Sequence, residues 1–131
     1  MKNKKIKSYD CDGVINLDEY GVGLRPSSMD DVIITGRSFE ESNSTLKWLK
    51  KHNIHNKIFF NDKKFIDKTR INSGRHKANI INNLNSEGYE VVIHYEDDPI
   101  QAEQIKLFSK FNVKVIMVNH DNLIEMENVR R

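Results

Sequence analysis

The chain has 131 residues, of which 37% are hydrophobic and 31% charged, and its net charge is +2. This length is typical of a single domain, which we expect to span residues 1–131. No apolar run approaches the ~20 residues that cross a membrane, and no apolar stretch of a signal peptide follows the basic start. One cysteine allows no internal disulfide and the five histidines lack zinc spacing, so we expect a cytoplasmic protein without a zinc site.

Short apolar runs typical of strands alternate along the chain with stretches of helical periodicity. Between the first and second runs, Gly21, Gly23 and Pro26 predict a hairpin or loop across residues 14–30. Residues 61–73 are expected to be irregular. In chain order, the expected strands cover residues 6–10, 32–34, 57–60, 91–97 and 113–118.

Three helices are expected from their terminal signals. A Ser-x-x-Glu capping box predicts that the first begins at Ser38. The second is expected to begin at Ser73 or Gly74 and to end at Gly88, and the third to begin at Asp98 with a proline in its first turn. The last dozen residues are expected to form a short terminal helix.

Strands that alternate with helices predict an α/β fold with a parallel sheet covered by helices. We expect a Rossmann-like three-layer sandwich with a five-stranded, mainly parallel sheet. In such sheets the ligand site lies beyond the carboxyl ends of the strands. The polar residues that follow the expected strands are therefore the first candidates for a functional site.

Two aspartates, Asp10 and Asp12, follow the first expected strand, with Cys11 between them and Gly13 after them. Residues two apart on an extended chain point the same way, so both carboxylates can face one ligand. Like charges this close repel unless a cation lies between them, and proteins hold Mg²⁺ with one or two carboxylates plus phosphate and water. A solvated acidic turn is the alternative interpretation of the same pattern.

A second acidic group, Glu96-Asp97-Asp98, ends the fourth expected strand. An acidic pair at this place can complete a metal site with Asp10, and Asp97 is the stronger candidate ligand. Three roles are open for Asp98, which directly precedes the third helix: a helix cap, a partner of Lys77, or a metal ligand acting through water.

Groups suited to phosphate follow the second strand and lie on the second helix. The Thr35 hydroxyl and the backbone amides near Gly36 can bind phosphate oxygens at a strand-to-helix turn, and Arg37 can add a bidentate contact. Lys77, on the second helix, can neutralise a phosphate or a carboxylate. Taken singly, these residues are better explained as an ordinary turn with a surface arginine and a solvated lysine.

Taken in this order, the residues resemble the motifs of the haloacid dehalogenase-like phosphohydrolase superfamily. Its members have an Asp-x-Asp pair after the first strand, a Thr or Ser after the second, a Lys on a helix, and an acidic pair after the fourth strand. The resemblance covers about residues 6–118. The matching residues are Asp10 with Asp12, Thr35, Lys77, and Glu96 with Asp97 and Asp98.

The resemblance implies a phosphomonoester hydrolase that depends on Mg²⁺. Asp10 would attack phosphorus and form an aspartyl-phosphate, and Asp12 would protonate the leaving oxygen and then activate water. Thr35 and Lys77 would hold the phosphoryl group. Further contacts to the substrate are expected from Gly36 and Arg37. The residues expected to hold the metal are Asp10, Asp12 through its main-chain carbonyl, Asp97 and Asp98.

The chain resembles a minimal member of this superfamily, with a short flap hairpin after the first strand and no cap domain. Residues 14–30 and 61–73, the two places where caps are inserted, are too short to form one. An open site suits a large substrate, and the chain looks most like the phosphatase domains of polynucleotide kinase-phosphatases. Those domains remove 3′-phosphates from DNA or RNA ends, so a polynucleotide 3′-phosphatase is the expected activity.

Two other functions remain open at this point. One is a phosphatase that acts on a small molecule such as a nucleotide or a sugar phosphate. The other is a non-catalytic phosphoacceptor or binding domain, which the order of the acidic residues and Lys77 along the chain disfavours. The oligomeric state is left open.

Overall fold

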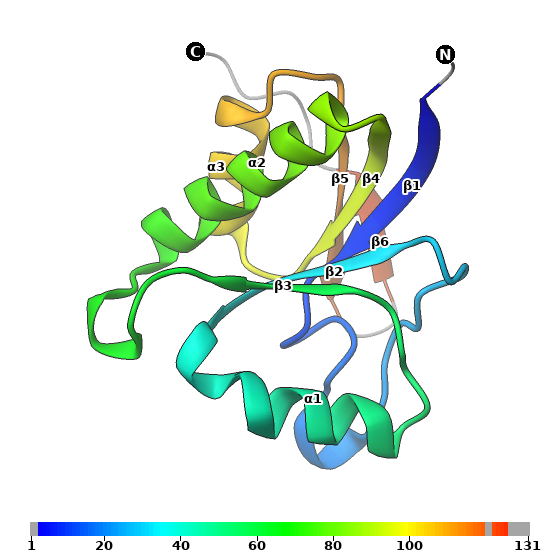
Figure 1. Cartoon of the computed structure of the whole chain (residues 1–131), viewed down its shortest axis with the longest axis vertical. Helices are drawn as coiled ribbons and strands as arrows, with labels where there is room; N and C mark the ends of the chain where they lie inside the picture. The colour runs from blue at the N-terminus through cyan, green and yellow to red at the C-terminus, as the bar shows by residue number, and fades with distance from the viewer. Residues whose placement is uncertain (1–2, 120–121, 126–131) are drawn as a thin grey trace.

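The computed structural model describes residues 3–119 and 122–125, which form an α/β fold with a mixed six-stranded sheet and three α-helices (Figure 1). None of the helices in this part of the chain is long and apolar enough to cross a membrane. The strands are β1 (Lys4–Tyr9), β2 (Val32–Ser38), β3 (Ile58–Asn61), β4 (Tyr89–Glu96), β5 (Lys114–Asn119) and β6 (Asn122–Glu125). The helices are α1 (Ser42–Lys51), α2 (Arg70–Ser86) and α3 (Pro99–Phe108), with short 3₁₀ helices η1 (Asp18–Tyr20), η2 (Phe39–Glu41) and η3 (Phe65–Asp67).

The strand order in the sheet is β3-β2-β1-β4-β5-β6. Strands β1 to β5 pair in parallel, whereas β6 runs antiparallel to β5. The expectation of five strands is therefore wrong, and so is the expected terminal helix over residues 122–125. The open edge of β5 offers unpaired backbone groups to the chain that follows, whereas a short isolated helix is marginal in water. Residues 126–131 of that expected helix lie outside the described part of the chain.

Apolar side chains cover both faces of the sheet, because alternate residues of a strand point to opposite faces. On one face Ile34 packs in a cluster with Ile81 of α2 and Ile105 of α3. On the other face Ile33 packs in a cluster with Leu49 of α1. Figure 1 shows α2 and α3 together on one side of β2 and β3, with α1 on the other side.

The predicted start signals of the first and third helices are confirmed. Ser38 and Glu41 form a capping box at η2, which leads directly into α1. The Asp98 side chain accepts a hydrogen bond from the backbone N–H of Ile100, and Pro99 stands in the first turn of α3.

The second helix begins earlier than expected. It starts at Arg70 rather than at Ser73 or Gly74, because Thr69 and Asn72 form a second capping box. The extra turn brings Gly74 inside the helix, where a Cβ would lie 2.9 Å from the backbone of α3. A glycine here therefore allows α2 and α3 to pack closely together.

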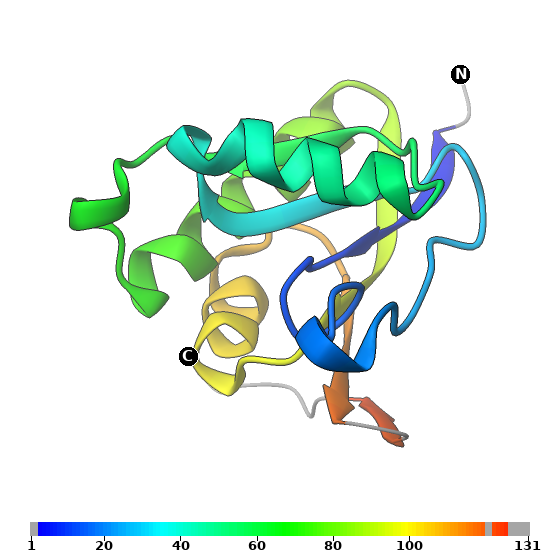
Figure 2. The ribbon, with the colours of Figure 1, turned by 90° about the horizontal axis from the view of Figure 1, so that it is seen from below.

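The expected hairpin across residues 14–30 contains no strand of the sheet. The backbone N–H groups of Gly23 and Leu17 donate to the carbonyl oxygens of Ile15 and Gly21, so the chain folds back around η1 as a compact loop. In Figure 2 this loop lies beside the turn that leads from β4 into α3. The loop after β1 therefore borders the carboxyl end of the sheet.

Candidate active site

An open cleft of about 620 Å³ lies at the carboxyl ends of β1, β2 and β4. Its walls include Asp10 and Asp12 after β1, Arg37 from β2, Arg70 at the start of α2, and Asp97 after β4. The parallel order of the strands brings these segments to one edge of the sheet, where α/β folds bind ligands.

Asp10 forms part of the cleft wall although only 4% of its surface is exposed. Its Oδ1 accepts hydrogen bonds from the backbone N–H of Cys11 at 2.8 Å and from Lys77 Nζ at 3.0 Å. Burial, followed by the negative charge of Glu96, raises the pKa of Asp10 to about 7, although Lys77 opposes this rise. The Asp10 carboxylate is thus oriented by two donors at Oδ1, and the positive charge of Lys77 only partly offsets the effects of burial and of Glu96.

The Asp97 carboxylate lies against Gly13 and forms part of the same cleft wall as Asp10. A Cβ at Gly13 would overlap this carboxylate, and the φ of +79° at Gly13 is itself a conformation that favours glycine. Burial, followed by the charge of Asp10, raises the pKa of Asp97 to about 7. Asp10, Glu96 and Asp97 each offer an oxygen within 4.8 Å of the others.

Lys77 is fully buried on α2 and bridges two of these carboxylates. Its Nζ lies 2.7 Å from Glu96 Oε1 and 3.0 Å from Asp10 Oδ1. Burial lowers the pKa of Lys77, but the charges of Asp10 and Glu96 outweigh that effect and leave the pKa raised. The lysine is therefore a permanent cation beneath Asp10, as the sequence predicted.

Two buried residues behind Lys77 were missed by the sequence analysis. His94 donates to or accepts from Glu96 and Ser8, with Nε2 at 3.0 Å from Glu96 Oε1 and Nδ1 at 2.7 Å from Ser8 Oγ. Burial, followed by the charge of Lys77, lowers the pKa of His94 to about 3. The available signal was periodicity: His94 and Glu96 are two apart on β4, and Ser8 pairs with His94 in register.

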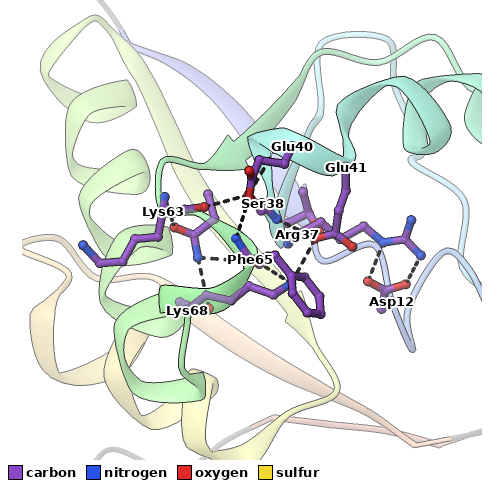
Figure 3. Close-up of polar contacts among 12 residues, drawn as sticks. Asp12, Arg37, Ser38, Glu40, Glu41, Lys63, Phe65 and Lys68 are labelled. Carbon is purple, nitrogen blue, oxygen red and sulfur yellow. Dashed lines mark hydrogen bonds and ion pairs between the residues drawn. The ribbon is translucent and has the colours of Figure 1, made fainter.

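Arg37 turns toward Asp12 rather than standing free for a ligand (Figure 3). Its Nε and one terminal nitrogen lie 2.8 and 2.7 Å from the two Asp12 oxygens, a bidentate pair, and its other terminal nitrogen lies 3.0 Å from Thr45 Oγ1. Asp12 remains half exposed in this pair. Arg37 thus fixes the direction in which the Asp12 carboxylate faces the cleft.

Thr35 has a different place from the one expected. Its side chain is fully buried, and its hydroxyl accepts a hydrogen bond from the Arg37 backbone N–H at 3.1 Å. The described cleft wall contains the neighbouring Gly36 and Arg37 but not Thr35. The hydroxyl therefore bonds within β2, next to the two residues that line the cleft.

The segment between β3 and α2 is bonded to η2 along one rim of the cleft (Figure 3). Ser38 Oγ donates to the Lys63 carbonyl at 2.7 Å, and the Phe65 N–H donates to Glu40 Oε1 at 2.8 Å. Lys68 Nζ lies 3.0 Å from a Glu41 carboxylate oxygen. These bonds fix the segment that carries Lys68, whose side chain supplies a positive charge to the cleft wall.

Asp98 occupies one of the three roles that the sequence left open. Its carboxylate caps α3 and pairs with Arg70, while Gln101 Nε2 donates to it at 2.9 Å. Burial alone would raise the pKa of Asp98, but hydrogen bonds from Arg70, Gln101 and the Ile100 N–H hold it at about 2. Among the described residues, the side-chain carboxylates that could hold one metal together are those of Asp10, Glu96 and Asp97, without those of Asp12 or Asp98.

No family model matches the sequence, and no curated protein or solved structure matches the chain. What bears on function is therefore the geometry of the cleft. It gathers Asp10, Lys77, Glu96 and Asp97, which the sequence had singled out, and it adds His94 and Ser8 behind them.

Proposed function

We propose that this protein is a Mg²⁺-dependent phosphomonoester hydrolase that forms an aspartyl-phosphate on Asp10. The observation that carries the proposal is the environment of this one carboxylate. Asp10 borders an open cleft, Lys77 holds its Oδ1 from below, and Asp97 lies across from it. Such an arrangement suits attack on phosphorus, because the lysine offsets the charge of the transferring group and leaves Oδ2 for the attack.

The residues present fit a magnesium ion. Asp10 and Asp97 supply the hard oxygen donors that Mg²⁺ prefers. Burial is the largest cause of the raised pKa of each, followed by the charge of Glu96 for Asp10 and by the charge of Asp10 for Asp97, so a cation bound here would meet carboxylates short of countercharge. When bound, Mg²⁺ would supply charge neutralisation for the phosphoryl oxygens. Asp10 and Asp97 would hold it, and the remaining positions would be left to phosphate and water.

The proposed reaction steps are those that the resemblance to the haloacid dehalogenase-like phosphohydrolases implies, assigned to the described side chains. Asp10 Oδ2 forms a bond to phosphorus as the bond from phosphorus to the leaving oxygen breaks, and Asp12 supplies the proton that this oxygen needs. A water molecule then attacks phosphorus, Asp12 accepts its proton, and the bond to Asp10 breaks to release inorganic phosphate. Arg37 keeps Asp12 in place by its two-point contact, which is the preorganisation these proton transfers require.

The fold supports placing the chain with the haloacid dehalogenase-like phosphohydrolases as a three-layer domain without a cap. Five strands of the sheet are parallel, and helices pack on both of its faces. In the described chain, the segments after β1 and β3 contain only η1 and η3. Their shortness leaves the cleft open, which supports a large substrate such as the 3′-phosphate end of a polynucleotide. A cytoplasmic location is part of this proposal.

The test is release of inorganic phosphate from a 3′-phosphorylated oligonucleotide, a nucleoside monophosphate and an aryl phosphate, each with Mg²⁺. Asp10→Asn should abolish release, whereas Asp67→Asn, on the exposed η3, should leave it unchanged. Release from the small esters alone would discard the polynucleotide and retain the chemistry. A stable phosphoenzyme without turnover would favour a phosphoacceptor domain, and activity in Asp10→Asn would remove the proposal.

A further inference from the structure

Four side chains behind Asp10 form an unbroken, buried chain of hydrogen bonds. Lys77 Nζ lies 2.7 Å from Glu96 Oε1, the same oxygen lies 3.0 Å from His94 Nε2, and His94 Nδ1 lies 2.7 Å from Ser8 Oγ. All four residues have 0% of their surface exposed. Polar groups buried this deeply are costly unless every one is paired, so the chain has to be satisfied along its whole length.

Only one arrangement of hydrogens satisfies this chain when the imidazole is neutral. The Glu96 carboxylate can only accept, so the hydrogen between it and His94 is carried by Nε2. A neutral imidazole then has a bare Nδ1, which accepts the hydroxyl hydrogen of Ser8. The donors therefore run from Ser8 to His94 to Glu96, and Lys77 donates to Glu96 from the other side.

We propose that Ser8, His94 and Glu96 act as positioning residues that hold the Lys77 ammonium against Asp10, and that Glu96 serves the lysine and not the metal. The inference rests on the function proposed above. His94 and Lys77 both donate to Glu96 Oε1, which fixes the carboxylate on the lysine side of the pocket.

This assignment divides three neighbouring carboxylates between two tasks. Asp10, Glu96 and Asp97 are close enough to share one cation, since each has an oxygen within 4.8 Å of the others. The bond from His94 prevents that outcome by keeping Glu96 on Lys77. Without the bond, Glu96 is free to turn toward the metal, and Lys77 loses the anchor that aims it at the phosphoryl group.

Activity toward an aryl phosphate tests the positioning role. His94→Leu removes the donor at similar volume and should lower kcat about 10- to 100-fold, the usual effect of losing a residue that orients another. His94→Gln, which can again donate to Glu96, should recover most of that loss. His55→Leu, on an exposed histidine, is the matched control and should leave kcat unchanged. Equal losses in His94→Leu and His94→Gln would overturn the inference, because a purely structural role does not depend on the donor.

Mg²⁺ binding followed by calorimetry tests the division of the carboxylates without any turnover. Asp97→Asn should weaken binding roughly 10- to 100-fold, as expected for a lost ligand, and Glu96→Gln should weaken it far less. Equal weakening by the two variants would show that Glu96 is a ligand and would overturn the inference. Circular dichroism of each variant verifies that it is folded before the comparison is made.

The wild-type protein gives a spectroscopic test that needs no substitution. Long-range ¹H–¹⁵N spectra should place the hydrogen of His94 on Nε2 and show a bare Nδ1. A hydrogen on Nδ1, or an imidazolium at pH 7, would overturn the relay. If the wild type hydrolyses no phosphomonoester, the proposed function fails, while the Mg²⁺ titrations and these spectra still decide how Glu96 and His94 are used.

Discussion

Replacing Asp97 with asparagine should stabilise the metal-free protein at pH 8 and at the same time reduce its stabilisation by Mg²⁺. In the folded chain, burial and the charge of Asp10 raise the pKa of Asp97 from 3.8 to about 7. The folded state therefore holds a proton that the unfolded chain has already released between about pH 4 and pH 7. Stability accordingly falls as pH rises through this window, and Asp97→Asn removes that loss.

The size of the effect follows from the span of the pKa shift. Three pKa units correspond to about 4 kcal/mol for a fully desolvated group. The Asp97 side chain remains partly exposed, so solvent screening reduces this to about 1–2 kcal/mol. For a domain of this size we expect a rise in Tm of roughly 3–8 °C at pH 8. At pH 5 we expect a rise of less than half that size, because pH 5 lies only about one pH unit above the unfolded pKa of 3.8.

Thermal unfolding with EDTA and with saturating Mg²⁺, at pH 5 and pH 8, is the measurement. The variant should be the more stable protein with EDTA at pH 8, and the order should reverse with Mg²⁺, because the wild type binds the ion more tightly and gains more stability from it. Asp67→Asn, on the exposed η3, serves as the control for removing one negative charge. The reasoning is refuted if Asp97→Asn is less stable than the wild type with EDTA at pH 8, or if Mg²⁺ stabilises both equally.

Three further outcomes are expected. Because Mg²⁺ displaces a proton that Asp10 and Asp97 hold with pKa values of about 7, its apparent affinity should fall about tenfold for each pH unit below 7, as measured by calorimetry. Gly13→Ala should weaken Mg²⁺ binding, since its Cβ overlaps Asp97, whereas Gly21→Ala, which has a similar positive φ and nothing within 4 Å, should only lower the Tm. Asp98→Ala should lower the free energy of unfolding, measured by chemical denaturation, by about 1 kcal/mol because α3 loses its cap, whereas Asp98→Asn keeps the cap. Unchanged Mg²⁺ affinity in both variants would show that Asp98 is not a metal ligand.

The sequence alone predicted the α/β class, the parallel strands β1 to β5, and three residues that come together at the cleft: Asp10 and Asp97 in its wall and Lys77 buried beneath Asp10. These features depend on local patterns: apolar periodicity, capping boxes, and polar residues at the ends of apolar runs. Asp10, Lys77 and Asp97 could be placed together because parallel strands deliver their carboxyl ends to one edge of the sheet. No long-range contact had to be known for that step.

The partners of these residues were decided only by the tertiary structure. Whether Arg37 faces a ligand or Asp12 depends on the path of the loop after β1, which brings the two within 2.8 Å across 25 residues of sequence. The pairing of β6 with β5 likewise depends on a sheet edge that exists only after folding.

Glu96 and His94 show the physical reason most clearly. In sequence, both are polar residues of a largely apolar strand, and periodicity says only that they point to the same face. Burial then removes water from both side chains, so they bond to the polar groups packed beside them. Glu96 accepts from Lys77 of α2, and His94 bonds to Ser8 of β1. Local pattern thus determined which groups stand near the carboxyl edge of the sheet. Packing determined which of them are bonded to one another and which are left free to bind a ligand.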